Sequence, residues 1–208
     1  MPALLLAHPG IDFSLEGEQQ AHTEAAEGLF RGLIIALLLI YALLAIPLRS
    51  YSQPLIIMSV IPFGTVGAVL GHLLMGWDVV FFSVLGMVAL AGVVVNASLV
   101  LVHFVNRRRE DGLPFLEAVS SAGVARFRPI ALTSVTTYAG LMPLMFEANP
   151  QATMMIPMAI SLGYGVLVAS VFTLFLVPAL YVVLEDARTL LPRLRHWLSG
   201  AEVPESAV

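Results

Sequence analysis

The chain has 208 residues, of which 59% are hydrophobic and 12% are charged, and its mean hydropathy is +0.91. Soluble domains carry about twice that charged fraction, so this composition excludes an ordinary soluble fold. The net charge of −4 gives no support to nucleic-acid binding, and the lack of cysteine excludes disulfides and cysteine nucleophiles.

The hydrophobic residues form five long blocks, and each is about as long as a helix that crosses the hydrocarbon core of a bilayer. We therefore predict an all-α integral membrane protein with about five transmembrane helices. The blocks cover about residues 29–48, 54–75, 79–105, 130–146 and 154–184.

Polar segments surround these blocks. Residues 1–27 are predicted to be an extracytoplasmic lead-in, residues 28–186 a five-helix transmembrane domain, and residues 187–208 a cytoplasmic tail. Residues 1–6 lack a basic region and are too short for a secretory signal, so no cleaved leader is expected. Between the third and fourth blocks, the string PFLEAVSSAGV is compatible with a short interfacial helix that does not span.

Glycines in the second block recur at spacings of three and four residues. Gly64, Gly67 and Gly71 therefore share one helix face, where a neighbouring helix can approach closely. This pattern predicts a helix-packing seam.

Arginines near membrane-spanning ends accumulate on the cytoplasmic side. Nine of the ten fall on one side of the predicted helices, and Arg31 alone lies on the other. The amino terminus is therefore predicted outside and the carboxy terminus inside. An odd number of spans with this orientation and no signal is typical of a chain whose upstream part is missing, although a short acidic tail can also cross by itself. The nine are Arg49, Arg107, Arg108, Arg109, Arg126, Arg128, Arg188, Arg193 and Arg195.

Several strings occur in an order that resembles the last five of the roughly twelve membrane helices of the resistance-nodulation-division (RND) family, in its drug and amphiphile efflux branch. The resemblance runs from about residue 10 to residue 186. The strings are SLEGEQ, LLLIYALLAIPLRSYSQPLIIMSVIPFGTVGAVLGHLL, GMVALAGVVVNASLVLVHFVNRRREDG, RFRPIALTSVTTYAGLMPL and IPMAISLGYG.

This resemblance implies a multi-pass permease of the bacterial inner membrane that is in contact with lipid. It implies a proton-driven homotrimer that works with a periplasmic adaptor and an outer-membrane channel. The lead-in would be the end of a periplasmic domain. The family's paired aspartates and its large substrate-binding domains have no counterpart in these 208 residues, so the chain is expected to be a fragment that is not competent alone.

The resemblance also suggests proton-relay residues. In the string VVVNASLVLVHF, Asn96 is kept, but Ala97 stands where the family branch has an acid. Thr133 and Arg126 match relay positions on and before the fourth helix. The alternatives are ordinary ones: Asn96 as a buried amide that joins two helices, Thr133 bonded to its own backbone, and Arg126 as a topology anchor.

Other polar residues in or near the blocks favour structural roles. Ser98 is expected to bond to its own helix backbone, and His103 to be interfacial. His72 and Asp78 are expected at the outer interface, with too few ligands for a metal. No hydrolase, metalloprotease or nucleotide-binding signature is present, so neither enzymatic activity nor a cofactor is expected.

Two other interpretations of the whole chain stay open. One is a small accessory or dominant-negative membrane protein that docks on a complete pump. The other is the silent product of a truncated gene. The DNA upstream would distinguish them, because a reading frame for the earlier helices would favour the remnant.

Overall fold

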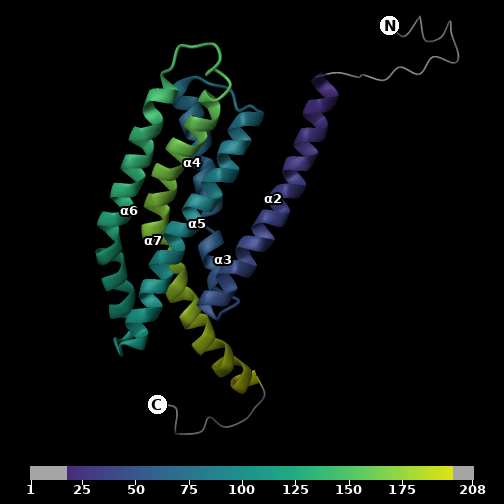
Figure 1. Cartoon of the computed structure of the whole chain (residues 1–208). Coiled ribbons are helices and arrows are strands. Elements are labelled where there is room, and N and C mark those ends of the chain that lie inside the picture. The colour runs from purple at the N-terminus through teal and green to yellow at the C-terminus, as the bar shows by residue number, and fades with distance from the viewer. Residues whose placement is uncertain (1–17, 199–208) are drawn as a thin grey trace, which may run out of the picture. The chain divides into compact units, whose positions relative to one another are not determined.

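The computed structural model describes the backbone of residues 18–198 and the side chains of residues 24, 25 and 27–187. Every regular element in this part of the chain is a helix, so the predicted all-α fold class is confirmed (Figure 1). The predicted lead-in before residue 18 and the end of the predicted tail lie outside the described residues, and the boundaries at 27/28 and 186/187 stay predictions. The helices are α2 (Glu18–Leu48), α3 (Gln53–Met58), α4 (Ile61–Met75), α5 (Phe81–Glu110), α6 (Phe115–Met145) and α7 (Ile156–Leu198).

Four described segments are long and apolar enough to cross a membrane: Glu27–Leu48, Gln53–Met75, Phe81–Glu110 and Ile156–Ala187. The fourth predicted block, residues 130–146, forms the second half of α6, a helix of 31 residues. The apolar stretch of α6 is shorter than those of the four spans because the first half of α6 carries charged and small polar residues.

The chain divides within α2 into two compact units, one ending at Leu39 and one beginning at Ile40. In the first unit, α2 exposes its large apolar side chains, with Phe30 and Leu38 both 65% exposed. Only 6% of the most apolar window of this span is buried. A helix that is apolar on all sides and this exposed requires lipid or another helix around it.

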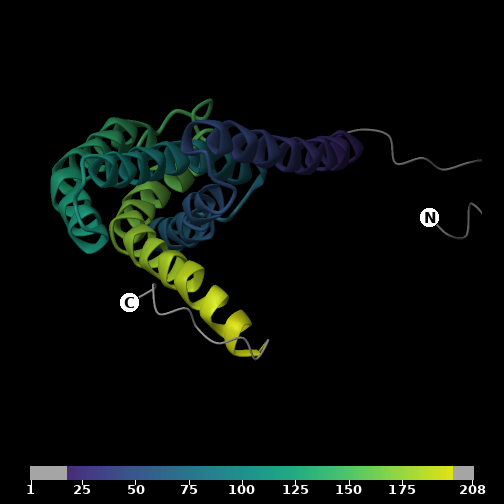
Figure 2. The same cartoon turned by 90° about the horizontal axis from the view of Figure 1, so that it is seen from below.

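In the second unit, α7 is the central helix. It packs against α4, α5 and α6, which lie around it (Figures 1 and 2). Branched aliphatic side chains fill the interface, and Val60, Leu90, Leu101 and Val177 are at most 1% exposed.

Glycines allow α4 to approach α7. A Cβ atom on Gly67 would lie 2.5 Å from the Cβ of Val168, and one on Gly71 would lie 2.5 Å from the Cβ of Tyr164. Gly64 is less crowded, because a Cβ atom on it would lie 3.1 Å from the nearest side-chain atom, the Cδ2 of Leu90. The three glycines thus face the α7 side of α4, on the helix face that their spacing predicts.

The second apolar block is two helices and not one. α3 ends at Met58 and α4 begins at Ile61, immediately before Pro62. Proline has no N–H group, so the carbonyl of Met58 loses its partner four residues ahead. Ser59 stabilises the break by donating its hydroxyl to the carbonyl of Ile56, at 2.6 Å.

The expected separate interfacial helix before the fourth block is wrong. The string PFLEAVSSAGV forms the start of α6, which continues through Pro129 to Met145. Ala118, Ala122, Ile130 and Ser134 are buried along one face, and the spacing of four or eight residues keeps that face continuous. Packing of this face against the core favours one long helix over two short ones.

Candidate functional site

Asn96 lies on a face of α5 that the other described helices leave uncovered. Its side chain is exposed, and it makes no hydrogen bond to another described residue. Val93 and Val100, one turn away on either side, are 43% and 39% exposed. Ala97 is half-buried and supplies no titratable group. This face therefore presents one amide within an apolar surface.

Thr133 is exposed on α6, and its hydroxyl is engaged by its own helix. The Oγ1 atom lies 3.0 Å from the carbonyl of Pro129 and 2.9 Å from that of Ile130. Thr136 forms the same kind of contact one turn later. Each hydroxyl proton is thus donated within the helix, while the oxygen can still accept a hydrogen bond from elsewhere.

Arg126 joins the start of α6 to the end of α5 through an aromatic ring. Its guanidinium lies 4.9 Å from the ring centroid of Phe104, and the guanidinium of Arg108 lies 5.1 Å from the same centroid. The Nε atom of Arg126 is buried and has no hydrogen-bond partner among the described residues. Cation–π attraction holds the guanidinium without a carboxylate.

The three relay candidates do not form a connected group in the described part of the chain. No hydrogen bond or ion pair joins Asn96, Thr133 and Arg126 there. The side chains of Asn96 and Thr133 are both exposed, so each can contact a helix that is not among the described ones.

Buried hydroxyls link the helices more directly. Ser98, fully buried, lies 3.4 Å from the hydroxyl of Thr173 on α7, so the expected bond to its own backbone is wrong. Ser134 on α6 makes a short hydrogen bond to Ser170 on α7. Both pairs connect residues 36 or more positions apart, so sequence spacing gives no signal for them.

His72 is buried and fully hydrogen-bonded in the last turn of α4, and its place at the outer membrane interface stays a prediction. Its Nδ1 atom lies 2.9 Å from the carbonyl of Ala68, and its Nε2 atom lies 2.8 Å from the hydroxyl of Ser83. Because a carbonyl only accepts, Nδ1 carries the proton of the neutral ring and Nε2 accepts from Ser83. The Ser83 oxygen also accepts from the Val80 N–H at 3.0 Å. These bonds join α4 to the start of α5.

A second polar network connects α3, α5 and α7 near the arginine-rich end. The amides of Gln53 and Asn106 pair reciprocally, at 3.3 Å and 3.0 Å. The hydroxyl of Tyr181 accepts from the Gln53 amide at 2.7 Å and donates to Asn106. Spacing along the chain gives no signal for this network because its members are 53 and 75 or more residues apart.

Comparison with known proteins gives consistent matches. The profile of the AcrB/AcrD/AcrF family matches residues 5–185. The multidrug resistance protein MdtC of Erwinia amylovora is 30% identical over 157 residues, which are 75% of this chain and 15% of that protein. MdtC of Proteus mirabilis is 29% identical over 181 residues, which are 86% of this chain and 18% of that protein.

Solved structures agree with these sequence matches. A crystal structure of a heavy metal efflux pump superposes with a TM-score of 0.72 and 27% identity, covering 85% of this chain and 18% of the pump. A second crystal form of a heavy metal efflux pump superposes with a TM-score of 0.72 and 26% identity, covering 88% of this chain and 19% of the pump. The chain thus spans less than a fifth of the length of each protein that it matches.

Proposed function

Because the chain belongs to the AcrB/AcrD/AcrF family of RND efflux permeases, we propose that it is the carboxy-terminal membrane portion of a proton-driven exporter of drugs or amphiphiles. The family match over residues 5–185 carries this proposal, since it includes all the described membrane spans except the last two residues of the final one. The names of the two MdtC relatives support drug export.

The proposed proton pathway uses the uncovered faces of α5 and α6. Asn96 and Thr133 are exposed there, so helices of the rest of the pump can contact them. Since the Thr133 hydroxyl proton is donated within its own helix, this residue would accept a hydrogen bond from the relay. Arg126, held over Phe104, would provide positive charge at one end of the path.

The sequence has no acid within the α5 span to carry the proton. Asp78 precedes α5 and Glu110 is its last residue, and no Asp or Glu lies between them. The family's paired aspartates likewise have no counterpart in these 208 residues. We therefore expect the chain expressed alone to export no dye. Ethidium accumulation in a pump-deleted strain would be unchanged by its expression, and reduced accumulation would contradict the proposal.

Substitution at residue 97 tests the pathway in a complete pump. In a chimera that carries this chain in place of the matching part of a family drug pump, Ala97→Asp should raise proton-dependent efflux by about tenfold or more, because a relay that lacks one member fails as a unit. The measurement is the ethidium efflux rate at equal protein level, with and without a proton gradient.

A matched substitution separates this effect from that of a new charge on the helix. Ala89→Asp places an acid on the exposed face of α5 that carries Asn96, two turns before Asn96, and should not raise efflux. Equal efflux rates for the unsubstituted chimera and the Ala97→Asp chimera would show that the pathway does not use this position.

We also propose the orientation and assembly that the family resemblance implies. The amino terminus would be periplasmic, the carboxy terminus cytoplasmic, and the complete pump a homotrimer with an adaptor and an outer-membrane channel. The pocket and ring contacts of Arg49, Arg107, Arg108, Arg109 and Arg126 support a common arginine-rich end. Reporter fusions at Glu110, Gln151 and after Arg195 should report inside, outside and inside, and a cytoplasmic signal at Gln151 would overturn this topology.

A further inference from the structure

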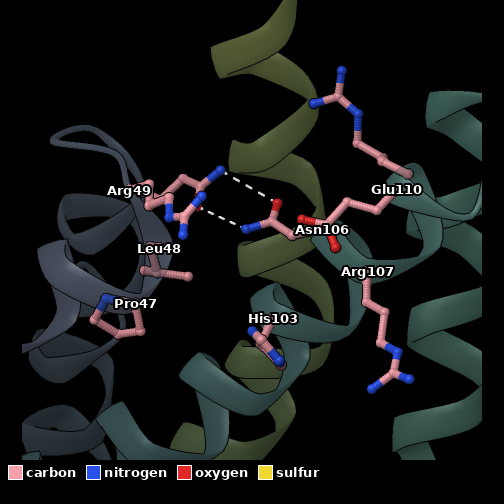
Figure 3. A pocket seen from close by; sticks show the side chains of 9 residues that line it. Pro47, Leu48, Arg49, His103, Asn106, Arg107 and Glu110 are labelled. Carbon is pink, nitrogen blue, oxygen red and sulfur yellow. Dashed lines mark hydrogen bonds between the residues drawn. The ribbon is translucent and has the colours of Figure 1, made fainter.

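A polar pocket of about 490 Å³ lies where three predicted membrane spans end. One wall is the end of α2 with Arg49, and the base includes Gln53 at the start of α3. The other wall is one face of α5, on which His103, Asn106, Arg107 and Glu110 follow one another at helical spacing. Figure 3 shows Arg49 on one side of this pocket and Asn106 and Glu110 on the other, while the Arg107 side chain extends away from Arg49.

The pocket gathers more positive than negative charge. Its lining includes three arginines and one acid, Glu110. Arg109 is paired with Glu185 at 2.7 Å, but Arg49 and Arg107 form no ion pair with any described residue. This excess of positive charge would attract an anion into the cavity. The pocket therefore has the charge of an anion site.

The backbone at Arg49 has a left-handed conformation. Its φ of 46° makes it the only non-glycine residue with positive φ in the described chain. Glycine or asparagine would fit this position just after α2 with less strain. A strained residue whose long cationic side chain lines a pocket points to a role for that side chain.

The floor of the pocket is rigid. Gln53 is 6% exposed and Asn106 is held by both Gln53 and Tyr181, so the polar groups between the two walls are already hydrogen-bonded to each other. The two amides therefore join the start of α3 to α5, and Arg49 and Arg107 remain as donors for a ligand.

The surface beside the pocket favours a lipid over a free ion. The last turns of α2 before Arg49 leave Leu43 66% exposed and Ile46 75% exposed. An acyl chain lying along these side chains would place its phosphate at the level of Arg49. Basic pockets between membrane helices on the cytoplasmic side are known to bind anionic headgroups.

We propose that this pocket binds the phosphate of an anionic phospholipid, with Arg49 as its hydrogen-bond donor. The phosphate oxygens accept hydrogen bonds from the Arg49 guanidinium, Arg107 adds positive charge to the lining, and Glu110 limits the charge that the site attracts. This inference concerns the chain's own residues and does not depend on proton coupling or on a drug substrate.

Native mass spectrometry of the purified full chain in detergent tests the proposal. Phosphatidylglycerol should remain bound under conditions that remove phosphatidylcholine, and inorganic phosphate should not displace it. Each of Arg49→Gln and Arg107→Gln should weaken phosphatidylglycerol binding about fivefold. Arg128→Gln is the matched control, because Arg128 is exposed outside the pocket and its loss should change nothing.

A substitution that should strengthen binding separates the loss of the site from a failure to fold. Glu110→Gln removes the one negative charge of the lining and should strengthen phosphatidylglycerol binding. No preference for phosphatidylglycerol over phosphatidylcholine, or equal binding by the Arg128→Gln and Arg107→Gln variants, would overturn the proposal. Displacement by inorganic phosphate would overturn the lipid as the occupant.

Discussion

Replacing Gly67 by alanine tests how closely α4 approaches α7. The new methyl carbon would lie 2.5 Å from the Cβ of Val168 and 3.1 Å from the backbone oxygen of Tyr164. Carbon atoms pack best at about 3.5–4.0 Å, so the two helices would have to separate by about 1 Å. Such overpacking typically costs about 1–3 kcal/mol.

A control substitution removes the effect of helix propensity. Alanine is about 1 kcal/mol better than glycine inside a helix, and this gain applies equally to Gly140 on α6, where an added Cβ meets nothing within 4 Å. Gly140→Ala should therefore stabilise the chain slightly. The free energy of unfolding of the Gly67→Ala variant should be about 1–3 kcal/mol lower than that of the Gly140→Ala variant.

The measurement is thermal unfolding of the purified chain in detergent, followed by circular dichroism at the helix minimum. Gly71→Ala should behave like Gly67→Ala, because its Cβ would lie 2.5 Å from that of Tyr164. If Gly67→Ala and Gly140→Ala unfolded at the same temperature, the close approach of α4 to α7 would be refuted.

Two further substitutions test the buried polar networks by the same unfolding measurement. Tyr181→Phe removes the hydroxyl that bonds to both paired amides and should lower the free energy of unfolding by about 1–3 kcal/mol. Tyr41→Phe is its control. This variant loses an exposed hydrogen bond to a backbone carbonyl, so its free energy of unfolding should fall by less than about 1 kcal/mol. Ser83→Ala leaves the Nε2 atom of His72 without its donor and should also cost about 1–3 kcal/mol, and the exposed Ser120→Ala is its control. Equal effects within either pair would contradict the assigned burial.

Much of the fold could be predicted because lipid imposes simple rules on a chain. Long apolar blocks must become helices that satisfy their own backbone groups, so the all-helical fold class and the approximate positions of four apolar spans follow from the hydrophobic pattern alone. The family resemblance came from strings within those helices. The break before Pro62 and the length of α6 did not follow, because a proline ends α3 but is tolerated at Pro129 inside α6.

The candidate site was predictable only in part. The sequence identified Asn96, Thr133 and Arg126 by resemblance, and their roles stay predictions. Nothing in it indicated that Arg126 would share the ring of Phe104 with Arg108, since the packing of α6 against α5 decides that contact. Spacing along one helix predicts a shared face but not the residue opposite it.

Contiguous residues are enough to establish that this protein is helical, that its helices are apolar enough to span a membrane, and which family it resembles, because hydrophobic block length and local strings are properties of single segments. Which polar groups meet depends on the folded arrangement. Gln53 contacts Tyr181, 128 residues away, His72 contacts Ser83 across a turn, and Arg49 lines the same pocket as Glu110. These pairings depend on how close α3, α4 and α7 approach, and that distance is set by glycine contacts and side-chain shape, which no single segment encodes.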